Sequence, residues 1–199
     1  YHGAAYAVVE ACAKVVASGA RYERMRFSYQ EYFERMTHDP RSWGKPFGAL
    51  LGTLKMQLEL GLPSIGGKDS MSGTFRSIDV PPTLVAFGIT TVDARRVISP
   101  EWKQAGSYLY LIEHCPTESL MPDTEQLKRN FGFVSDAIGC GTIRSAWAVG
   151  FGGIAEALAK MSFGNGIGAE VEIDEERLFG YAYGSIVVES ATPLEYADA

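Results

Sequence analysis

The spacing of apolar residues in two early stretches is the feature that most constrains how this chain can fold. The first stretch has apolar side chains at helical intervals and stops at Gly19 (Ala5, Val8, Val9, Cys12 and Val16). A second helical pattern places five apolar residues on one face, after a Pro- and Gly-rich turn at residues 39–46 (Phe47, Leu50, Leu51, Leu54 and Leu58). The apolar run at residues 83–91 then predicts a strand buried on both faces. Helices and strands in this order predict an α+β fold.

The second half of the chain shows the same mixture after a connector at residues 98–106, which contains Pro, Gly and several charges. Asp123 is a good cap for a following helix, and a shorter helix is predicted from Gly153 through Met161. Alternating or continuous apolar residues predict three strands, at residues 107–113, 169–173 and 185–189. We therefore predict two α+β units, at residues 1–98 and 104–199.

Composition excludes several classes of protein. Of the 199 residues, 46% are hydrophobic and 21% are charged, too apolar a mixture for a disordered chain. No apolar run approaches the roughly 18 residues of a membrane helix, so we expect a soluble protein with no membrane partner. The net charge of −6 and the lack of a basic stripe argue against nucleic acid as a partner. The three cysteines lie far apart without a CxxC pair, which favours reduced thiols and a cytoplasmic protein.

The segment GGKDSMSG, at residues 66–73, carries the residue types that phosphate binding needs. We take six of them as candidate phosphate- or nucleotide-binding residues: Gly66, Gly67, Lys68, Asp69, Ser70 and Ser72. The glycines allow close approach of the backbone, the lysine supplies a positive charge, and the carboxylate of Asp69 is a candidate ligand for Mg²⁺. A solvated Gly-rich turn is the alternative. A P-loop is excluded, because Gly67 intervenes before Lys68 and Asp69 replaces the required Ser or Thr.

Several segments resemble the second synthetase-like repeat of the phosphoribosylformylglycinamidine synthase family, the glutamine-dependent ligases of the purine pathway. The most specific is IGGKDSMSGTF, followed by DVPPTLVAFGIT. The resemblance also includes YHGAAYAVVEACAKVVASGA, RFSYQEYFERM, WGKPFGALLG and GFGGIAEALAKMSFGN. It therefore extends over essentially the whole chain.

This resemblance implies an AIR-synthetase-like N-terminal domain that contributes to a barrel, at residues 1–98, and part of an AIR-synthetase-like C-terminal α/β sandwich, at 104–199. It implies an ATP-dependent, Mg²⁺-dependent enzyme that converts formylglycinamide ribonucleotide to formylglycinamidine ribonucleotide with ammonia from glutamine. Its partners would be the first repeat and the glutaminase domain of the same polypeptide. We expect strands of both domains to lie outside these residues. We therefore expect the 199-residue chain to be inactive alone and to self-associate through exposed sheet edges.

The chain departs from the family's commoner pattern in two places. Many relatives carry an HDRSDGG-like segment and an acidic segment that serve an auxiliary Mg-nucleotide site. Here residues 147–153 and 180–184 contain no acid. Because a metal-bound polyphosphate needs carboxylates, the alternative is a degenerate repeat that only scaffolds the enzyme. We expect no catalytic residue in this chain, with Cys12 in the core, and no metal at the scattered His2, His38 and His114.

Overall fold

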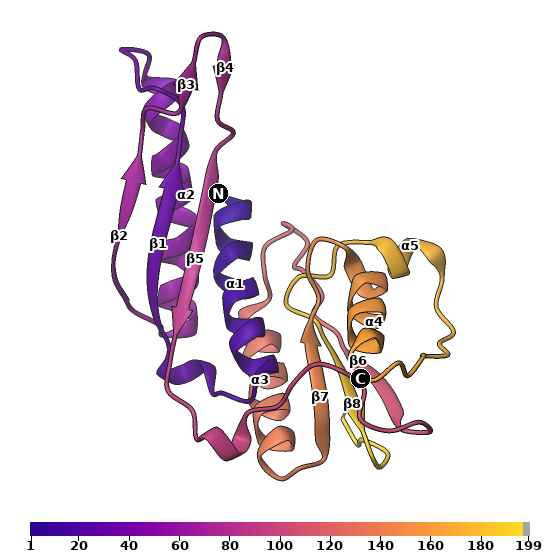
Figure 1. Ribbon diagram of the computed structural model, residues 1–199. Helices are drawn as coiled ribbons and strands as arrows, with labels where there is room; N and C mark the ends of the chain where they lie inside the picture. The colour runs from indigo at the N-terminus through magenta and orange to yellow at the C-terminus, as the bar shows by residue number, and fades with distance from the viewer. Residues whose placement is uncertain (197–199) are drawn as a thin grey trace.

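The computed structural model describes residues 1–196 and contains two three-stranded sheets with helices packed against them (Figure 1). Helix α1, His2–Ala17, lies between the two halves of the molecule and packs against elements of both. Its buried stripe includes Val8, Cys12 and Val16, as the helical spacing predicts. The core position of Cys12 is thereby confirmed.

The first half contains a sheet with strand order β2-β1-β5. Strands β1 and β2 are parallel and are joined by helix α2, whereas β5 is antiparallel to β1. A short hairpin of β3 and β4 lies between β2 and β5. The element bounds are β1 Arg26–Tyr32, α2 Pro40–Leu60, β2 Ser64–Ser70, β3 Thr74–Phe75, β4 Ile78–Asp79 and β5 Thr83–Ile89, with single 3-10 turns at Tyr22–Arg24 and Ala94–Arg96.

Helix α2 begins earlier than predicted, so the expected turn at residues 39–46 is wrong beyond its first residue. The Asp39 side chain caps the helix by accepting a hydrogen bond from the backbone N–H of Arg41 at 3.0 Å, and Pro40 occupies the first position. The apolar residues expected on one face do share a face, but it is exposed: Phe47, Leu50, Leu51, Leu54 and Leu58. Smaller residues face α1, where Gly52 lies against the backbone of the first residue.

Strand β5 has one half-buried and one exposed face, so the prediction of burial on both faces is wrong. Residues Leu84, Ala86 and Gly88 face the helices, and Gly88 lies against α1. The alternate residues are exposed on the opposite side of the sheet, hereafter the open face: Val85, Phe87 and Ile89. The apolar run is continuous because the open face is itself apolar along this strand.

The second half contains a sheet with strand order β6-β8-β7, with all pairs antiparallel. The strands predicted near residues 107–113 and 185–189 are confirmed, and so is the capped helix after Asp123. The strand predicted at 169–173 is wrong, since this segment forms no ladder in the described structure. The bounds are β6 Tyr108–Ile112, α3 Thr124–Gly139, β7 Ile143–Ala148, α4 Gly153–Phe163, α5 Glu175–Phe179 and β8 Ile186–Ser190.

One large core cluster joins the two halves. It contains α1 residues such as Val8 and Cys12 together with Phe131 of α3 and Val188 of β8. The division into units at 1–98 and 104–199 therefore stays a prediction.

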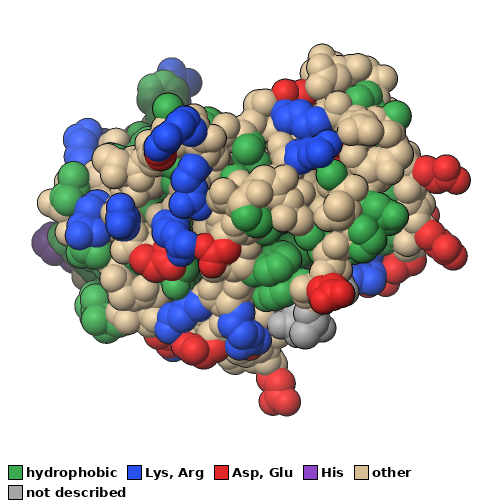
Figure 2. Space-filling view, turned by 90° about the horizontal axis from the view of Figure 1, so that it is seen from below, with side chains coloured by type: hydrophobic (Ala, Val, Ile, Leu, Met, Phe, Trp, Pro, Cys, Tyr) green, Lys and Arg blue, Asp and Glu red, His purple; other side chains and the backbone are tan. Residues whose placement is uncertain are grey.

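The molecular surface carries charges of both signs. On the face shown in Figure 2, lysines and arginines alternate with acidic side chains and with small apolar areas. Within residues 1–196, no helix has the length and apolar character needed to cross a membrane.

Candidate functional site

The GGKDS segment lies in edge strand β2, so the expected Gly-rich loop is wrong for residues 66–70. The turn starts only after Ser70 and is held against the segment that follows β1. There Ser70 accepts a backbone hydrogen bond from Phe33 at 2.8 Å, and Gly73 donates one to Phe33 at 2.9 Å. Ser72, the last of the predicted residues, is exposed in this turn. The segment is therefore a rigid strand followed by a fixed turn.

The strand register separates the six candidate residues into two groups. Lys68 is paired with Gln30 of β1, and Asp69 is paired with Glu31. Since successive side chains of a strand point to opposite faces, Lys68 lies on the open face and Asp69 on the face that the helices cover. Gly66 and Ser70 share the side of Lys68, and Gly67 shares the side of Asp69. One loop does not gather all six residues around a single point.

Glycine is required at positions 66 and 67 for different structural reasons. A Cβ atom at Gly67 would lie 2.5 Å from the carbonyl oxygen of Tyr29, so the close approach of β1 and β2 requires glycine there. Gly66 has a φ of 139°, which other residues rarely adopt, and no atom lies within 4 Å of its Cβ position. Only Gly66 therefore offers open backbone to a ligand.

The paired carboxylates of Glu31 and Asp69 are the most unusual electrostatic feature of the sheet. The Glu31 residue is only 1% exposed, and neither of its carboxylate oxygens has a hydrogen-bond partner. Burial, together with the neighbouring Asp69 carboxylate, raises the pKa of Glu31 to about 7. Asp69 is exposed at the sheet edge. A buried acid thus lies next to one that solvent reaches.

This pair has the chemistry that a divalent cation requires. Two orphaned oxygens of Glu31 and the carboxylate of Asp69 are hard donors, and a cation between them would remove both the repulsion and the desolvation penalty. Mg²⁺ usually takes one or two carboxylates and completes its shell with water and phosphate oxygens. The residues present therefore suit Mg²⁺, with Glu31 added to the predicted ligand Asp69.

The position of the pair in the fold also suits a ligand. Glu31 and Asp69 lie near the carboxyl ends of the parallel strands β1 and β2, the edge at which helix α2 begins (Figure 1). In β-α-β units, ligands commonly bind beyond this end, where the helix N-terminus favours negative charge. Sequence reasoning missed Glu31. The available signal was its place in the alternation Phe27, Tyr29, Glu31, Phe33, which puts a carboxylate on an otherwise apolar face.

The segments expected to lack an auxiliary nucleotide site lie together between the two halves. The rings of Phe151 and Tyr181 are 5.7 Å apart. Two carboxylates, from Glu10 of α1 and Glu156 of α4, each lie 3.8 Å from the Cβ position of Gly150. Each is paired with a lysine four residues later, at 2.8 Å for Lys14 and 2.5 Å for Lys160. These acids come from outside the two segments, and their charge is already balanced.

The environments of the remaining candidate residues are those of structural residues rather than of catalytic or metal-binding ones. Burial raises the pKa of the Cys12 thiol to about 12, which opposes a nucleophilic role. The His114 ring bonds the Tyr183 carbonyl at 2.8 Å and accepts from the Asp123 N–H at 3.0 Å. No group of three or more potential metal-ligating side chains occurs among residues 1–196.

Comparison with known proteins gives no matching family model but several similar proteins. The chain is 30% identical over 161 residues to phosphoribosylformylglycinamidine synthase subunit PurL of Thermoplasma acidophilum. It is 28% identical over 203 aligned positions, covering 90% of the chain, to PurL of Thermus thermophilus. The resemblance to phosphoribosylformylglycinamidine synthase is confirmed. The chain spans only 21% and 27% of the length of these two PurL relatives.

The structure of Thermotoga maritima PurL complexed with ATP has a similar fold, with a TM-score of 0.70 and 17% identity. The match covers 96% of this chain and 33% of that chain. The same protein complexed with FGAR matches with a TM-score of 0.71. The predicted AIR-synthetase-like α+β fold is therefore confirmed.

Proposed function

We propose that this chain forms part of the synthetase region of an ATP-dependent, glutamine-using ligase of purine biosynthesis. The reaction would convert formylglycinamide ribonucleotide to formylglycinamidine ribonucleotide. The observation that carries this proposal is the Glu31–Asp69 pair of β1 and β2, with Lys68 on the opposite face of β2, whose sequence resembles that family. The ATP and FGAR complexes of Thermotoga maritima PurL support the choice of ligands. The 199 residues alone would turn over nothing, because the first repeat and a glutaminase domain are also needed.

The two groups of residues on β2 would have different roles. Lys68 and Ser70, on the open face, would contact phosphate oxygens of ATP or of the ribonucleotide, with Gly66 as the open backbone position and Ser72 in the following turn. Electrostatic placement of phosphates in this way stabilises charge that develops during phosphoryl transfer. Both groups meet at the sheet edge, because β2 has a strand neighbour on one side only among the described residues.

Glu31 and Asp69 would hold Mg²⁺ at this edge. The ion would supply positive charge to the phosphate oxygens, as it does in other phosphoryl-transfer enzymes. The carboxylates of Asp69 and Glu31 would fix its position, and Glu31, whose raised pKa of about 7 keeps it partly protonated at neutral pH, would give up its proton. Mg²⁺ binding would therefore release a proton near pH 7.

Titration of the 199-residue chain with ATP, with and without Mg²⁺, tests this assignment. We expect saturable binding that requires Mg²⁺, and a loss of about tenfold in affinity for Lys68→Ala, since a hydrogen bond to a charged group contributes roughly 1.5–3 kcal/mol. Asp69→Asn should remove the Mg²⁺ dependence. Lys128→Ala is the matched control, because Lys128 lies on α3 and pairs with Glu125.

The second candidate function is that of a structural repeat which scaffolds the enzyme without binding a ligand. The apolar open face favours it, since Val85, Phe87 and Ile89 are exposed in a row on β5. A face of this kind marks a surface that packs against protein. Titrations with no Mg²⁺-dependent binding, and equal behaviour of Lys68→Ala and the control, would support the scaffold and overturn the ligand site.

The same open face leads us to propose that the isolated chain self-associates in solution. We also propose that the protein is cytoplasmic. In the complete enzyme the first synthetase-like repeat would cover the open face. Sedimentation at about tens of micromolar should show dimers or larger species, and Phe87→Lys should shift the population to monomer. Monomers at every concentration would contradict self-association without affecting the ligand site.

A further inference from the structure

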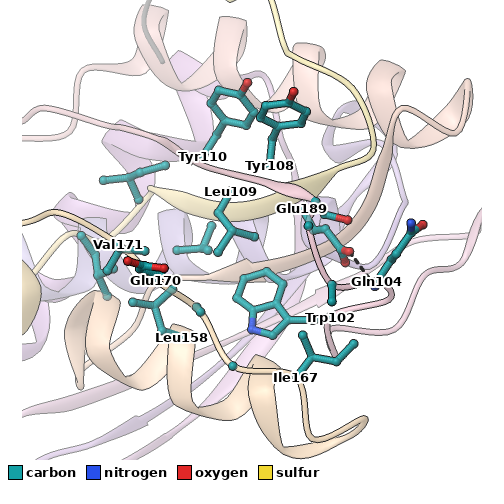
Figure 3. A pocket seen from close by; sticks show the side chains of 18 of the residues that line it. Trp102, Gln104, Tyr108, Leu109, Tyr110, Leu158, Ile167, Glu170, Val171 and Glu189 are labelled. Atoms are coloured by element: carbon teal, nitrogen blue, oxygen red, sulfur yellow. Dashed lines mark hydrogen bonds between the residues drawn. The ribbon is translucent and has the colours of Figure 1, made fainter.

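Strand β6 leads from a hollow beside the second sheet to a buried cluster of hydrogen-bonded groups. Along the strand, Leu109 faces a hollow of about 970 Å³ that Trp102 and Leu158 also line (Figure 3). Beyond the end of the strand at Ile112, His114 is only 4% exposed. The hydrogen bonds of this buried ring, rather than the hollow, indicate how this part of the molecule responds to pH.

His114 is bonded to two other segments of the chain. Its backbone N–H donates a hydrogen bond to the hydroxyl of Ser185 at 2.9 Å. The ring nitrogen Nδ1 bonds the carbonyl oxygen of Tyr183 at 2.8 Å, and Nε2 bonds the backbone N–H of Asp123 at 3.0 Å. The residue therefore connects the end of β6 to the segment before β8 and to the residue that caps α3.

The two partners of the ring determine where its proton lies. A carbonyl oxygen only accepts a hydrogen bond, so Nδ1 must donate to Tyr183, and an N–H only donates, so Nε2 must accept from Asp123. Both bonds therefore need a neutral ring with its proton on Nδ1. Protonation places a second N–H on Nε2, where it faces the N–H of Asp123, and the bond to Asp123 is lost.

The surroundings of the ring oppose a positive charge. Burial lowers the pKa of His114, although the Tyr183 carbonyl and the Asp123 carboxylate act in the opposite direction. Gly184 packs against the ring so closely that a Cβ atom there would lie 2.9 Å from Nδ1, which leaves the ring little room to turn. The titratable groups around it are Tyr6 and Glu10 on α1, Asp123 before α3, Tyr183 before β8, and Glu113 and Cys115 on either side in the chain.

Most of these groups add no charge next to the ring. Burial raises the pKa of Tyr6 and Tyr183, so both stay neutral in acid. Glu10 and Glu113 are paired with Lys14 at 2.8 Å and Arg177 at 2.9 Å. Asp123 is therefore the acid that faces the ring.

The loop that joins His114 to α3 is bonded to the first turns of α1. The Tyr6 hydroxyl donates a hydrogen bond to the Leu120 carbonyl at 3.2 Å, and the His2 ring bonds the Ser119 carbonyl at 3.0 Å. Leu120 has a φ of 59°, a conformation that is unfavourable for leucine. Such a conformation persists only where the surrounding contacts impose it. The loop should therefore relax when one of its ends is released.

We propose that His114 is an acid-sensitive latch at the junction of the two halves. The neutral ring holds Asp123 and keeps the loop at residues 115–122 against α1, whereas the protonated ring releases Asp123 and loosens this loop. The Asp123 carboxylate, which caps α3, is the negative group available to the protonated ring, so release also weakens the cap. Because α1 packs against both halves, the junction becomes less stable in acid.

NMR spectroscopy of the 199-residue chain tests the latch in two steps. The nitrogen chemical shifts should place the proton of the neutral His114 ring on Nδ1. The released ring binds a proton at its ordinary pKa of 6.5, so each pH unit below this value favours release by up to about tenfold. The hydrogen-exchange protection factor of the Asp123 amide should therefore fall by about tenfold or more between about pH 7 and pH 5, while those of the β7 amides do not fall.

His114→Gln separates protonation from structure. Its side-chain amide can donate to the Tyr183 carbonyl and accept from the Asp123 N–H, but it does not titrate. The protection factor of the Asp123 amide should then stay within about twofold between the two pH values. The matched control is His38→Gln, at an exposed position, which should behave like the parent chain.

Four results would overturn the latch. They are a neutral His114 ring with its proton on Nε2, an equal protection factor of the Asp123 amide at both pH values, an equal fall in His114→Gln, and a matching fall in the β7 amides, which would mean that the whole chain opens. If His114→Gln does not fold, the position of the ring proton and the exchange of the parent chain still decide the question.

Discussion

Glu31 and Asp69 are cross-strand neighbours on β1 and β2, and they share the face of the sheet that the helices cover. One carboxylate is buried without a hydrogen-bond partner, and the other is exposed at the sheet edge. Like charges on two paired residues repel each other, and burial makes the inner one costly to ionise. A cation bound between the two carboxylates would offset this cost, and the pair therefore carries the proposed function.

The pair predicts a pH-dependent stability. Burial and Asp69 raise the pKa of Glu31 from 4.5 to about 7, so between these values the folded chain binds more protons than the unfolded chain. The free energy of unfolding should therefore fall as the pH rises through this window. At about pH 8, Glu31→Gln should unfold at a higher urea concentration than the parent chain, with a free energy of unfolding greater by at most roughly 3 kcal/mol. At about pH 4, the free energies of unfolding of the two chains should differ little.

Glu23→Gln is the control for this comparison, because Glu23 is exposed on a 3-10 turn. Its free energy of unfolding at about pH 8 should lie within about 0.5 kcal/mol of that of the parent chain. Parallel pH profiles for Glu31→Gln and the parent chain would show that Glu31 has an ordinary pKa, which the account does not allow. Added Mg²⁺ should reduce the difference between the two chains at about pH 8.

Glu189 should behave in the opposite way. Burial alone would raise the pKa of this fully buried carboxyl, but hydrogen bonds from the Lys103 N–H, the Ser145 hydroxyl at 2.8 Å and the Gln104 N–H lower it overall. Its stabilising contribution is present above the unfolded-state pKa and is lost as the pH falls through the lower folded-state pKa. Glu189→Gln should cost about 2 kcal/mol at neutral pH.

Urea unfolding at about pH 7 and about pH 3 measures this effect, and the cost of Glu189→Gln should shrink at the lower pH. Glu172→Gln, at an exposed position, should change stability by less than about 0.5 kcal/mol at either pH. A cost for Glu189→Gln that does not depend on pH would mean that the carboxylate charge has no part in holding residues 103 and 104.

Two glycine substitutions should have opposite signs. Gly67→Ala forces a Cβ atom against the Tyr29 carbonyl oxygen and should destabilise the chain by roughly 1–3 kcal/mol. Gly48→Ala lies within helix α2, where no atom is within 4 Å of its Cβ position, and should stabilise by roughly 0.5–1 kcal/mol. Thermal unfolding measures both. An unchanged free energy of unfolding for Gly67→Ala would mean that β1 and β2 lie too far apart for the Cβ atom to contact the Tyr29 carbonyl oxygen.

The N-terminal cap of α3 can be tested with one substitution that removes the hydrogen-bond acceptor and one that keeps it. Asp123 accepts a hydrogen bond from the Gln126 N–H at 2.9 Å, so Asp123→Ala should cost about 1 kcal/mol. Asp123→Asn keeps an acceptor and should lower the free energy of unfolding by only a few tenths of a kcal/mol. Chemical denaturation of the three chains measures the effect, and an equal loss for Ala and Asn would assign the cost to the charge rather than to the cap.

Local patterns predicted much of the fold. The helix that contains Cys12 and the capped helix after Asp123 lie where their spacing placed them, because one side of each is buried against a neighbour. The helical spacing of apolar residues could not show that Leu54 and Leu58 face solvent, because the sequence pattern of an apolar stripe is the same whether or not another element covers it. Likewise, the alternation at 169–173 predicts a strand only where a partner edge exists.

The candidate site was predicted in its residue types but not in its geometry. Glycines suggested a loop, yet Gly67 serves the close contact of two strands. The strand register then places Lys68 and Asp69 on opposite faces, which depends on pairing between distant residues. Glu31 lies more than thirty residues before Asp69 in the chain, so no local motif joins the two carboxylates.

The measurement that tests the central claim most directly is the rate of Asp69→Asn in the complete synthetase that contains this segment. ATP hydrolysis and amidine formation are followed with saturating ammonia, so that glutamine use does not limit the rate. We predict that both rates fall about a hundredfold, while Glu125→Gln on α3 keeps the parent rates. Rates within about twofold of the parent for Asp69→Asn would contradict the site and leave this segment as a scaffold.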